Sequence, residues 1–175
     1  IGAVDGRTVY DAGENISGLV RIRTHAPSGS TIRIRFAEEL AADGTLAFSS
    51  AGSGYTCRSG VPQIMADTFI TSGGDETFLP SFVWHAFRYF DVCGEIDFAE
   101  VCVIHADLPV TAAFESDCNG MNFLYDAYLR TELSSIHGSV PMDCPHRERL
   151  GYTGDGQVTA EAAMCTLDAR AFYHK

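Results

Sequence analysis

Thr31-Ile32-Arg33-Ile34-Arg35-Phe36 alternates apolar and charged or polar side chains along its whole length. A period of two is typical of a β-strand that buries one face and exposes the other. Val20-Arg21-Ile22-Arg23 repeats the pattern, and the turn-forming segment Ala26-Pro27-Ser28-Gly29-Ser30 lies between the two stretches. Together they predict a β-hairpin.

Further short stretches with the composition of strands follow, separated by turns such as Ser72-Gly73-Gly74-Asp75. They cover residues 68–71, 76–79, 86–92 and 99–104. Several short strands with frequent turns favour an antiparallel β-sandwich, which we expect over residues 1–115. Residues 41–62 are rich in Gly, Ser and Ala and predict a long loop between strands.

The pattern becomes helical after Pro109. Ser116 or Asp117 can cap a helix whose apolar residues recur at helical spacing, and Gly138 can end it. Its apolar positions are Met121, Leu124, Tyr125, Tyr128, Leu129, Leu133 and Ile136. The fold class predicted for the chain is therefore α+β, with a helical part over residues 116–175.

Asp155 lies where the N-cap of a second helix is expected. The apolar positions of that helix are Val158, Ala162, Cys165, Ala169 and Phe172. Apolar helix faces need another surface to cover them, either the sandwich or a second copy of the chain, so a homo-oligomer is one expectation. The side chains that we expect to be buried in this way are Leu124, Leu129, Leu133, Val158 and Phe172.

The 175-residue chain carries 12 basic and 23 acidic residues, a net charge of −11. It has no basic stripe for a phosphate backbone or an anionic membrane, so neither nucleic acid nor membrane is an expected partner. No apolar run approaches the ~18–20 residues of a membrane span.

The six cysteines show neither a CxxC pair nor the spacing of a zinc finger. Scattered cysteines favour free, buried thiols over disulfides, which leans weakly toward a reducing, cytoplasmic compartment without fixing the localisation. No signal peptide is visible, and both ends look cut, so we expect a piece of a longer protein.

A cluster of reactive side chains follows the first predicted helix, in Asp143-Cys144-Pro145-His146-Arg147-Glu148-Arg149-Leu150-Gly151-Tyr152-Thr153-Gly154-Asp155. Three carboxylates, two arginines, an imidazole and a phenol fall within thirteen residues, with a proline and two glycines that interrupt a helix. A loop of this kind can gather carboxylates around a small polar ligand or a reacting bond. Such carboxylates acquire separated pKa values, so that one stays protonated while others are charged.

This motif resembles the signature of the bacterial α-L-rhamnosidases of glycoside hydrolase family 78, Asp-Cys-Pro-Gln-Arg-(Asp)-Glu-Arg-Leu-Gly-Trp-Thr-Gly-Asp. His146 stands where Gln is usual and Tyr152 where Trp is usual, and one residue fewer separates Arg147 from Glu148. Other segments resemble the same family in the same order: 13–18, 34–40, 43–46, 82–89, 105–109 and 114–116. The resemblance implies a β-sandwich followed by the first helices of an (α/α)6 barrel, which is truncated here.

The resemblance also implies roles for five residues. Glu148 matches the general acid that protonates the leaving glycosidic oxygen. Asp143, Arg147, Tyr152 and Asp155 match positions that bind the sugar. The residues alone leave other interpretations open, because Glu148 could be a surface acid paired with Arg149 or Arg147, and Asp155 could simply cap a helix. Tyr152 can stack on an apolar sugar face with less area than tryptophan offers.

The activity implied is inverting hydrolysis that releases terminal L-rhamnose from glycosides or polysaccharides, with no cofactor. The base that activates water would lie beyond this chain, which alone is expected to be inactive. Two alternatives stay open: a non-catalytic carbohydrate-binding β-sandwich, and an (α/α)6-barrel glycosidase of different specificity. His137, Cys144 and His146 do not have the spacing of a zinc site, so no metal is expected.

Overall fold

The computed structural model describes residues 2–49, 51, 65–138, 140–147 and 149–174. The chain divides into two compact units. The first contains residues 1–104 and 146–148, and the second contains residues 105–145 and 149–175. Within the described residues, no helix is both long and apolar enough to cross a membrane.

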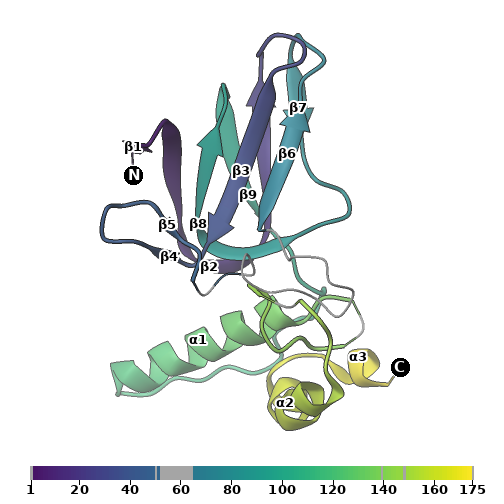
Figure 1. The fold of residues 1–175 in the computed structure, drawn as a ribbon. Coiled ribbons are helices and arrows are strands. Elements are labelled where there is room, and N and C mark those ends of the chain that lie inside the picture. The colour runs from purple at the N-terminus through teal and green to yellow at the C-terminus, as the bar shows by residue number, and fades with distance from the viewer. Residues whose placement is uncertain (1, 50, 52–64, 139, 148, 175) are drawn as a thin grey trace. The chain divides into compact units, whose positions relative to one another are not determined.

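The first unit is built from antiparallel strands (Figure 1). One sheet of seven strands has the order β1-β2-β8-β3-β6, and β7 and β9 both pair with β2; β4 and β5 form a separate pair. The strands are β1 (Gly2–Val4), β2 (Arg7–Thr24), β3 (Thr31–Ala37), β4 (Glu39–Leu40), β5 (Leu46–Ala47), β6 (Ala66–Ile70), β7 (Glu76–Phe78), β8 (His85–Cys93) and β9 (Phe98–Val103).

The long strand β2 changes partners along its length. Its first part pairs with β8, from Thr8 opposite Val92 to Gly18 opposite His85, and its second part pairs with β9 from Gly18 onward. A Cβ atom on Gly18 would lie 2.3 Å from the carbonyl oxygen of Cys102 on β9. Only glycine therefore allows β2 to approach β9 this closely at the point where it leaves β8.

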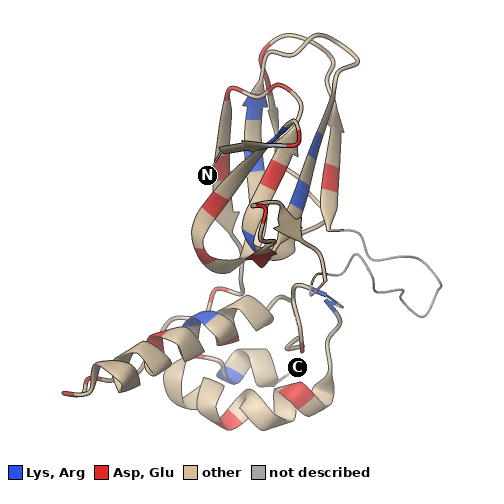
Figure 2. Cartoon of the chain, turned by 60° about the vertical axis from the view of Figure 1, so that its left-hand side comes forward, with Lys and Arg blue, Asp and Glu red and all other residues tan. Residues whose placement is uncertain are grey.

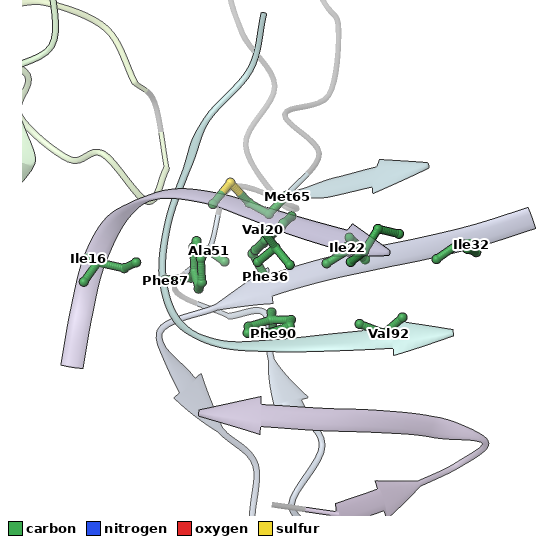
Figure 3. Packing of buried hydrophobic residues seen from close by; sticks show 11 residues of the cluster. Ile16, Val20, Ile22, Ile32, Phe36, Ala51, Met65, Phe87, Phe90 and Val92 are labelled. Atoms are coloured by element: carbon green, nitrogen blue, oxygen red, sulfur yellow. The ribbon is translucent and has the colours of Figure 1, made fainter. Parts of the chain in front are cut away.

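The change of partner folds the sheet over one apolar core. Figure 3 shows Val20 and Ile22 of β2 packed with Phe36 of β3 and with Phe87 and Phe90 of β8. The apolar members of the alternating stretches are the buried ones, as the period of two predicts. The predicted α+β class, with an antiparallel sandwich followed by helices, is confirmed.

The predicted hairpin between residues 20–23 and 31–36 is wrong. Both stretches are strands, but β3 pairs with β6 and β8, whereas this part of β2 pairs with β7 and β9. The turn between them connects two strands that do not pair with each other. At Gly18, β2 stops pairing with β8, which is the neighbour of β3, and pairs with β9 instead. The four later strand predictions coincide with β6, β7, β8 and β9. Most of the predicted loop at 41–62 lies outside the described residues.

A buried carboxylate ties three strands of the sheet together. Asp91 of β8 has a side chain only 2% exposed. Arg7 of β2 donates to its Oδ1 at 2.8 Å, and Arg35 of β3 donates to both of its oxygens. These hydrogen bonds hold the pKa of Arg35 above its ordinary value. The acid is thus compensated by two cations, as a buried charge requires.

The second unit contains α1 (Asn119–Ser135), α2 (Thr153–Thr166) and the short α3 (Arg170–Tyr173). Their core consists of Ile136, Ala163, Leu167, Ala169 and Phe172, with Leu108, Leu129, Leu133 and Tyr173 packed against it. An isolated bridge between Val110 and Leu167 connects the start of the unit to the end of α2.

The second predicted helix differs from the structure at both ends. Its N-cap is Tyr152 and not Asp155, which lies in the first turn of α2. The helix ends at Thr166, and Phe172 belongs to α3. The first helix has Cys118 rather than Ser116 or Asp117 as its N-cap, and it ends at Ser135, before Gly138.

Two of the five side chains expected to be buried are exposed. Leu124 is 59% and Val158 is 84% exposed, whereas Leu129, Leu133 and Phe172 pack in the core of this unit. Leu124 and Val158 each precede a core position, Leu129 and Ala163, by five residues. Five residues turn an α-helix by about 140° beyond a full turn, which places both side chains away from the core face.

Candidate sugar-binding site

The loop that carries the motif of residues 143–155, called the motif loop below, is closed by one short pairing between its two arms. Met142 and Gly151 form an isolated antiparallel bridge, and the amide of Tyr152 donates to the Pro141 carbonyl at 3.1 Å. A Cβ atom on Gly151 would lie 2.8 Å from Cβ of Val140. Glycine at this position therefore lets the two arms of the loop approach each other.

The same pairing places the start of α2 against the other arm. Gly156 is buried, and a Cβ atom there would contact the ring of Pro141 at 3.3 Å. The Gly156 amide donates to the carbonyl of the N-cap residue Tyr152 at 3.1 Å. Asp155 thus lies in the first helical turn, where the helix dipole favours a carboxylate.

Within the loop, one residue has an unusual backbone conformation and one side chain orients a carboxylate. Arg149 has a φ of 55°, in the left-handed region that non-glycine residues seldom adopt. The Cys144 thiol donates to Oδ2 of Asp143, 2.9 Å away. This contact makes Cys144 a neighbour that orients the Asp143 carboxylate, and the thiol is one of five cysteines of the described residues that form no disulfide.

A pocket of about 350 Å³ opens between α1, the arm before the loop, and α2. Asp143 and Asp155 both line it, although they lie on opposite sides of the loop closure. The other lining residues are Thr131, Glu132, Ser135, Pro141, Met142, Gly154, Val158 and Thr159. Carboxylates and hydroxyls together with apolar atoms make a suitable surface for a neutral ligand rich in hydroxyl groups.

The charges around the pocket are mainly negative. The helices α1 and α2 carry Asp126, Glu132, Asp155 and Glu161, and Arg130 is the one basic residue within their described ranges (Figure 2). A phosphate or carboxylate ligand would be repelled by this field. No group of three or more His, Cys, Asp or Glu side chains among the described residues is arranged to hold a metal ion.

The structure brings together two of the five site residues that the sequence predicted, Asp143 and Asp155. Tyr152 is exposed at the N-cap of α2 and is not part of this pocket lining. Arg147 is exposed and is grouped with the first unit. Glu148, the expected general acid, lies outside the described residues.

Sequence reasoning missed Glu132, the most buried acid of the pocket. It is 5% exposed, and its Oε1 has no hydrogen-bond partner in the part of the chain that the structure describes. Burial raises the pKa of Glu132, and a hydrogen bond with the Thr159 hydroxyl offsets part of that rise. One signal could have found it: Glu132 lies three residues after Leu129 and four before Ile136, on the apolar face of α1.

Comparison with known proteins identifies the two regions of the chain. Residues 2–109 match the concanavalin-like domain of bacterial α-L-rhamnosidases, and residues 109–175 match their six-hairpin glycosidase domain. Both regions are therefore parts of one kind of glycosidase. The chain belongs to the bacterial α-L-rhamnosidase family.

Individual relatives agree with the family models. An α-L-rhamnosidase from Streptomyces avermitilis is 34% identical over 97% of this chain, and one from Formosa agariphila is 32% identical over 98%. The chain spans only 16% and 18% of the lengths of these two proteins.

Solved structures have the same fold. An α-L-rhamnosidase from Dictyoglumus thermophilum superposes with a TM-score of 0.83 at 32% identity, over 97% of this chain and 19% of that one. The Streptomyces avermitilis α-L-rhamnosidase complexed with L-rhamnose superposes with a TM-score of 0.79, over 97% of this chain and 16% of that one. The family expected from the motif at 143–155 is confirmed.

Proposed function

We propose that the full-length protein containing this chain is an inverting α-L-rhamnosidase, which releases terminal L-rhamnose from glycosides or polysaccharides. The observation that carries the proposal is the pocket in which Asp143 and Asp155 meet, within a chain of the α-L-rhamnosidase family. These carboxylates would accept hydrogen bonds from sugar hydroxyls. Arg147 would donate to the sugar or to a neighbouring carboxylate, and Tyr152 would stack on an apolar sugar face.

Glu148 is the proposed general acid. In the sequence it lies between Asp143 and Asp155, at the position that matches the general acid of the family motif. Protonation of the glycosidic oxygen by Glu148 would allow the bond to rhamnose to break. In an inverting reaction a second carboxylate, roughly 6.5–9.5 Å from the first, activates water on the opposite face of the sugar. No residue of this chain is assigned to that role.

The proposal is tested with the full-length protein and a panel of aryl glycosides. Turnover of the α-L-rhamnoside, with β-L-rhamnose as the first-formed product in an NMR time course, is the expected result. Preferred turnover of another glycoside would instead indicate an (α/α)6-barrel glycosidase of different specificity. Saturable sugar binding by residues 1–115, together with no turnover of any glycoside by the full-length protein, would favour a carbohydrate-binding sandwich.

The isolated 175-residue chain is expected to have no measurable hydrolase activity. It contains the proposed acid without a base, and acid–base assistance contributes about 10²–10⁴-fold per group. The same assay on the purified chain tests this expectation, and clear turnover would contradict it.

A further inference from the structure

We infer that Glu132 is a further ligand-binding residue of the pocket, where its carboxyl accepts a hydrogen bond from one ring hydroxyl of the bound sugar. The inference rests on the proposed function, because it assumes that L-rhamnose occupies the pocket lined by Asp143 and Asp155. It adds a residue from α1 to a site otherwise built from the motif loop and α2.

The Glu132 side chain is buried at the pocket wall. Glu132 lines the same pocket as Asp143 and Asp155, but it is 95% buried whereas they are exposed. Burying an ionised carboxylate away from cations is strongly unfavourable. No Lys, Arg or His side chain is among the residues that line the pocket with it. Burial therefore raises the pKa of Glu132, and its carboxyl can accept a hydrogen bond whether or not it is protonated.

The two oxygens of the Glu132 carboxyl have different surroundings. The Thr159 hydroxyl lies 3.1 Å from the backbone carbonyl of Asp155 and also contacts the Glu132 carboxyl. Its hydrogen bond with Glu132 holds the pKa of that carboxyl below the value that burial alone would give. The other carboxyl oxygen has no such partner among the described residues.

One of these oxygens has no hydrogen-bond partner among the described residues. Oε1 of Glu132 exposes less than 1 Å² and makes no hydrogen bond with the described residues. A buried acceptor without a partner is destabilising and needs an explanation. Glu132 lines the pocket, and the last side-chain torsion of glutamate is broad, so rotation about it can bring Oε1 to the pocket. A sugar hydroxyl there would supply the missing donor.

The test is a double-mutant cycle on the full-length protein, read by calorimetric titration. The ligands are L-rhamnose and its 2-deoxy, 3-deoxy and 4-deoxy analogues. Replacing Glu132 by Met removes both oxygens from a side chain of similar length. We expect Glu132→Met to weaken L-rhamnose binding by about 5- to 20-fold. In the wild type, one deoxy analogue should bind more weakly than L-rhamnose, because it lacks the hydroxyl from which Glu132 accepts a hydrogen bond. In Glu132→Met, that analogue and L-rhamnose should bind equally well.

Two further variants control for folding and for charge. Glu132→Gln should recover most of the affinity lost in Glu132→Met, because its amide can donate to Thr159 while its oxygen accepts from the sugar. Glu161→Met, the same replacement at an exposed position of α2, should bind as wild type does. If thermal unfolding by circular dichroism shows that Glu132→Met is unfolded, the cycle is run with Glu132→Ala.

Each remaining outcome contradicts the inference. Equal loss of affinity for all four sugars in the variant would mean that Glu132 only maintains the shape of the unit. Unchanged affinity in Glu132→Met would mean that it makes no contact with the sugar. A wild-type protein that binds no L-rhamnose would overturn the proposed function together with the inference, whereas the first two outcomes leave that function standing.

Discussion

Asp143 and Asp155 line one pocket although they lie on opposite arms of the loop that the Met142–Gly151 bridge closes. The bridge brings the two arms together. Gly156, at the start of α2, packs closely against Pro141, and this contact positions the neighbouring Asp155 at the pocket. Two carboxylates that the sequence separates thus face the same small volume. This relationship is the structural basis for the sugar site proposed above.

Removing either carboxylate charge should weaken sugar binding. In the full-length protein, Asp143→Asn and Asp155→Asn should each weaken L-rhamnose binding by about 10-fold, because each replaces a charged acceptor of a hydroxyl by a neutral amide. Calorimetric titration measures the change. Asp126→Asn, at an exposed position of α1 outside the pocket, is the matched control and should bind as wild type. Normal affinity in both pocket variants would exclude this pocket as the sugar site.

Replacing Glu148 by Gln should separate two kinds of substrate. Gln keeps the shape of the side chain but cannot give a proton to the leaving oxygen. For an alkyl rhamnoside, whose leaving group needs protonation, kcat/KM should fall by about 10²-fold or more. An activated aryl rhamnoside should lose less, and the affinity for substrate should change little because the acid serves the transition state. If both substrates lost activity equally, the proton donor would have to be another residue.

Breaking the buried ion pairs of Asp91 should destabilise the sandwich. Asp91→Ala leaves Arg7 and Arg35 without their common partner, and we expect a loss of about 3 kcal/mol in the free energy of unfolding. Urea unfolding followed by the fluorescence of Trp84, the single tryptophan, measures it. The control is Glu100→Ala, which breaks the exposed pair with Arg21 and should change stability by less than about 1 kcal/mol. Equal effects of the two variants would contradict the assignment.

Glu132 should make the stability of the helical unit depend on pH. Burial raises its pKa above the ordinary value of 4.5, so the folded state keeps a proton that the unfolded state releases. The unfolding free energy contributed by this group is therefore highest below 4.5 and falls as pH rises toward the raised pKa. Asp143 and Asp155 also lie at the pocket, but they are unchanged in the variant Glu132→Gln, so a difference between the two proteins reports on Glu132.

Glu132→Gln removes this pH dependence because the amide is uncharged at every pH. The variant should match wild type near about pH 4 and should have a higher Tm near about pH 8. Thermal unfolding by circular dichroism across this range measures the difference. A difference in Tm that stays constant with pH would show that Glu132 titrates alike in the folded and unfolded states.

The sequence predicted the positions of the strands better than it predicted which strands pair with each other. The alternation in residues 31–36 gave both the strand and its buried face, because side chains point to opposite sides at every second residue. The alternation contained no information on which other strand would pair with residues 31–36. That depended on Gly18, where contact with Cys102 takes β2 from β8 to β9, and the expected hairpin failed for this reason.

The helices show the same limit. Helical spacing correctly placed Leu129, Leu133 and Phe172 in the core, but it did not distinguish Leu124 and Val158, which lie on another face. Asp155 was expected to be an N-cap because aspartate is common there. The loop pairing at Met142 instead places the N-cap of α2 three residues earlier, at Tyr152.

The sequence by itself determined the family, the α+β class and the acids of the motif, because these depend on residue identity and on local periodicity. Only the tertiary structure decided that Asp143 and Asp155 share a pocket and that Glu132 is the buried acid beside them. Burial and hydrogen-bonding partners arise from segments far apart in the chain, here α1, the motif loop and α2. The position of Glu132 on the apolar face of α1 is a sign of burial in the sequence, but its partners and the pocket exist only once α2 faces it.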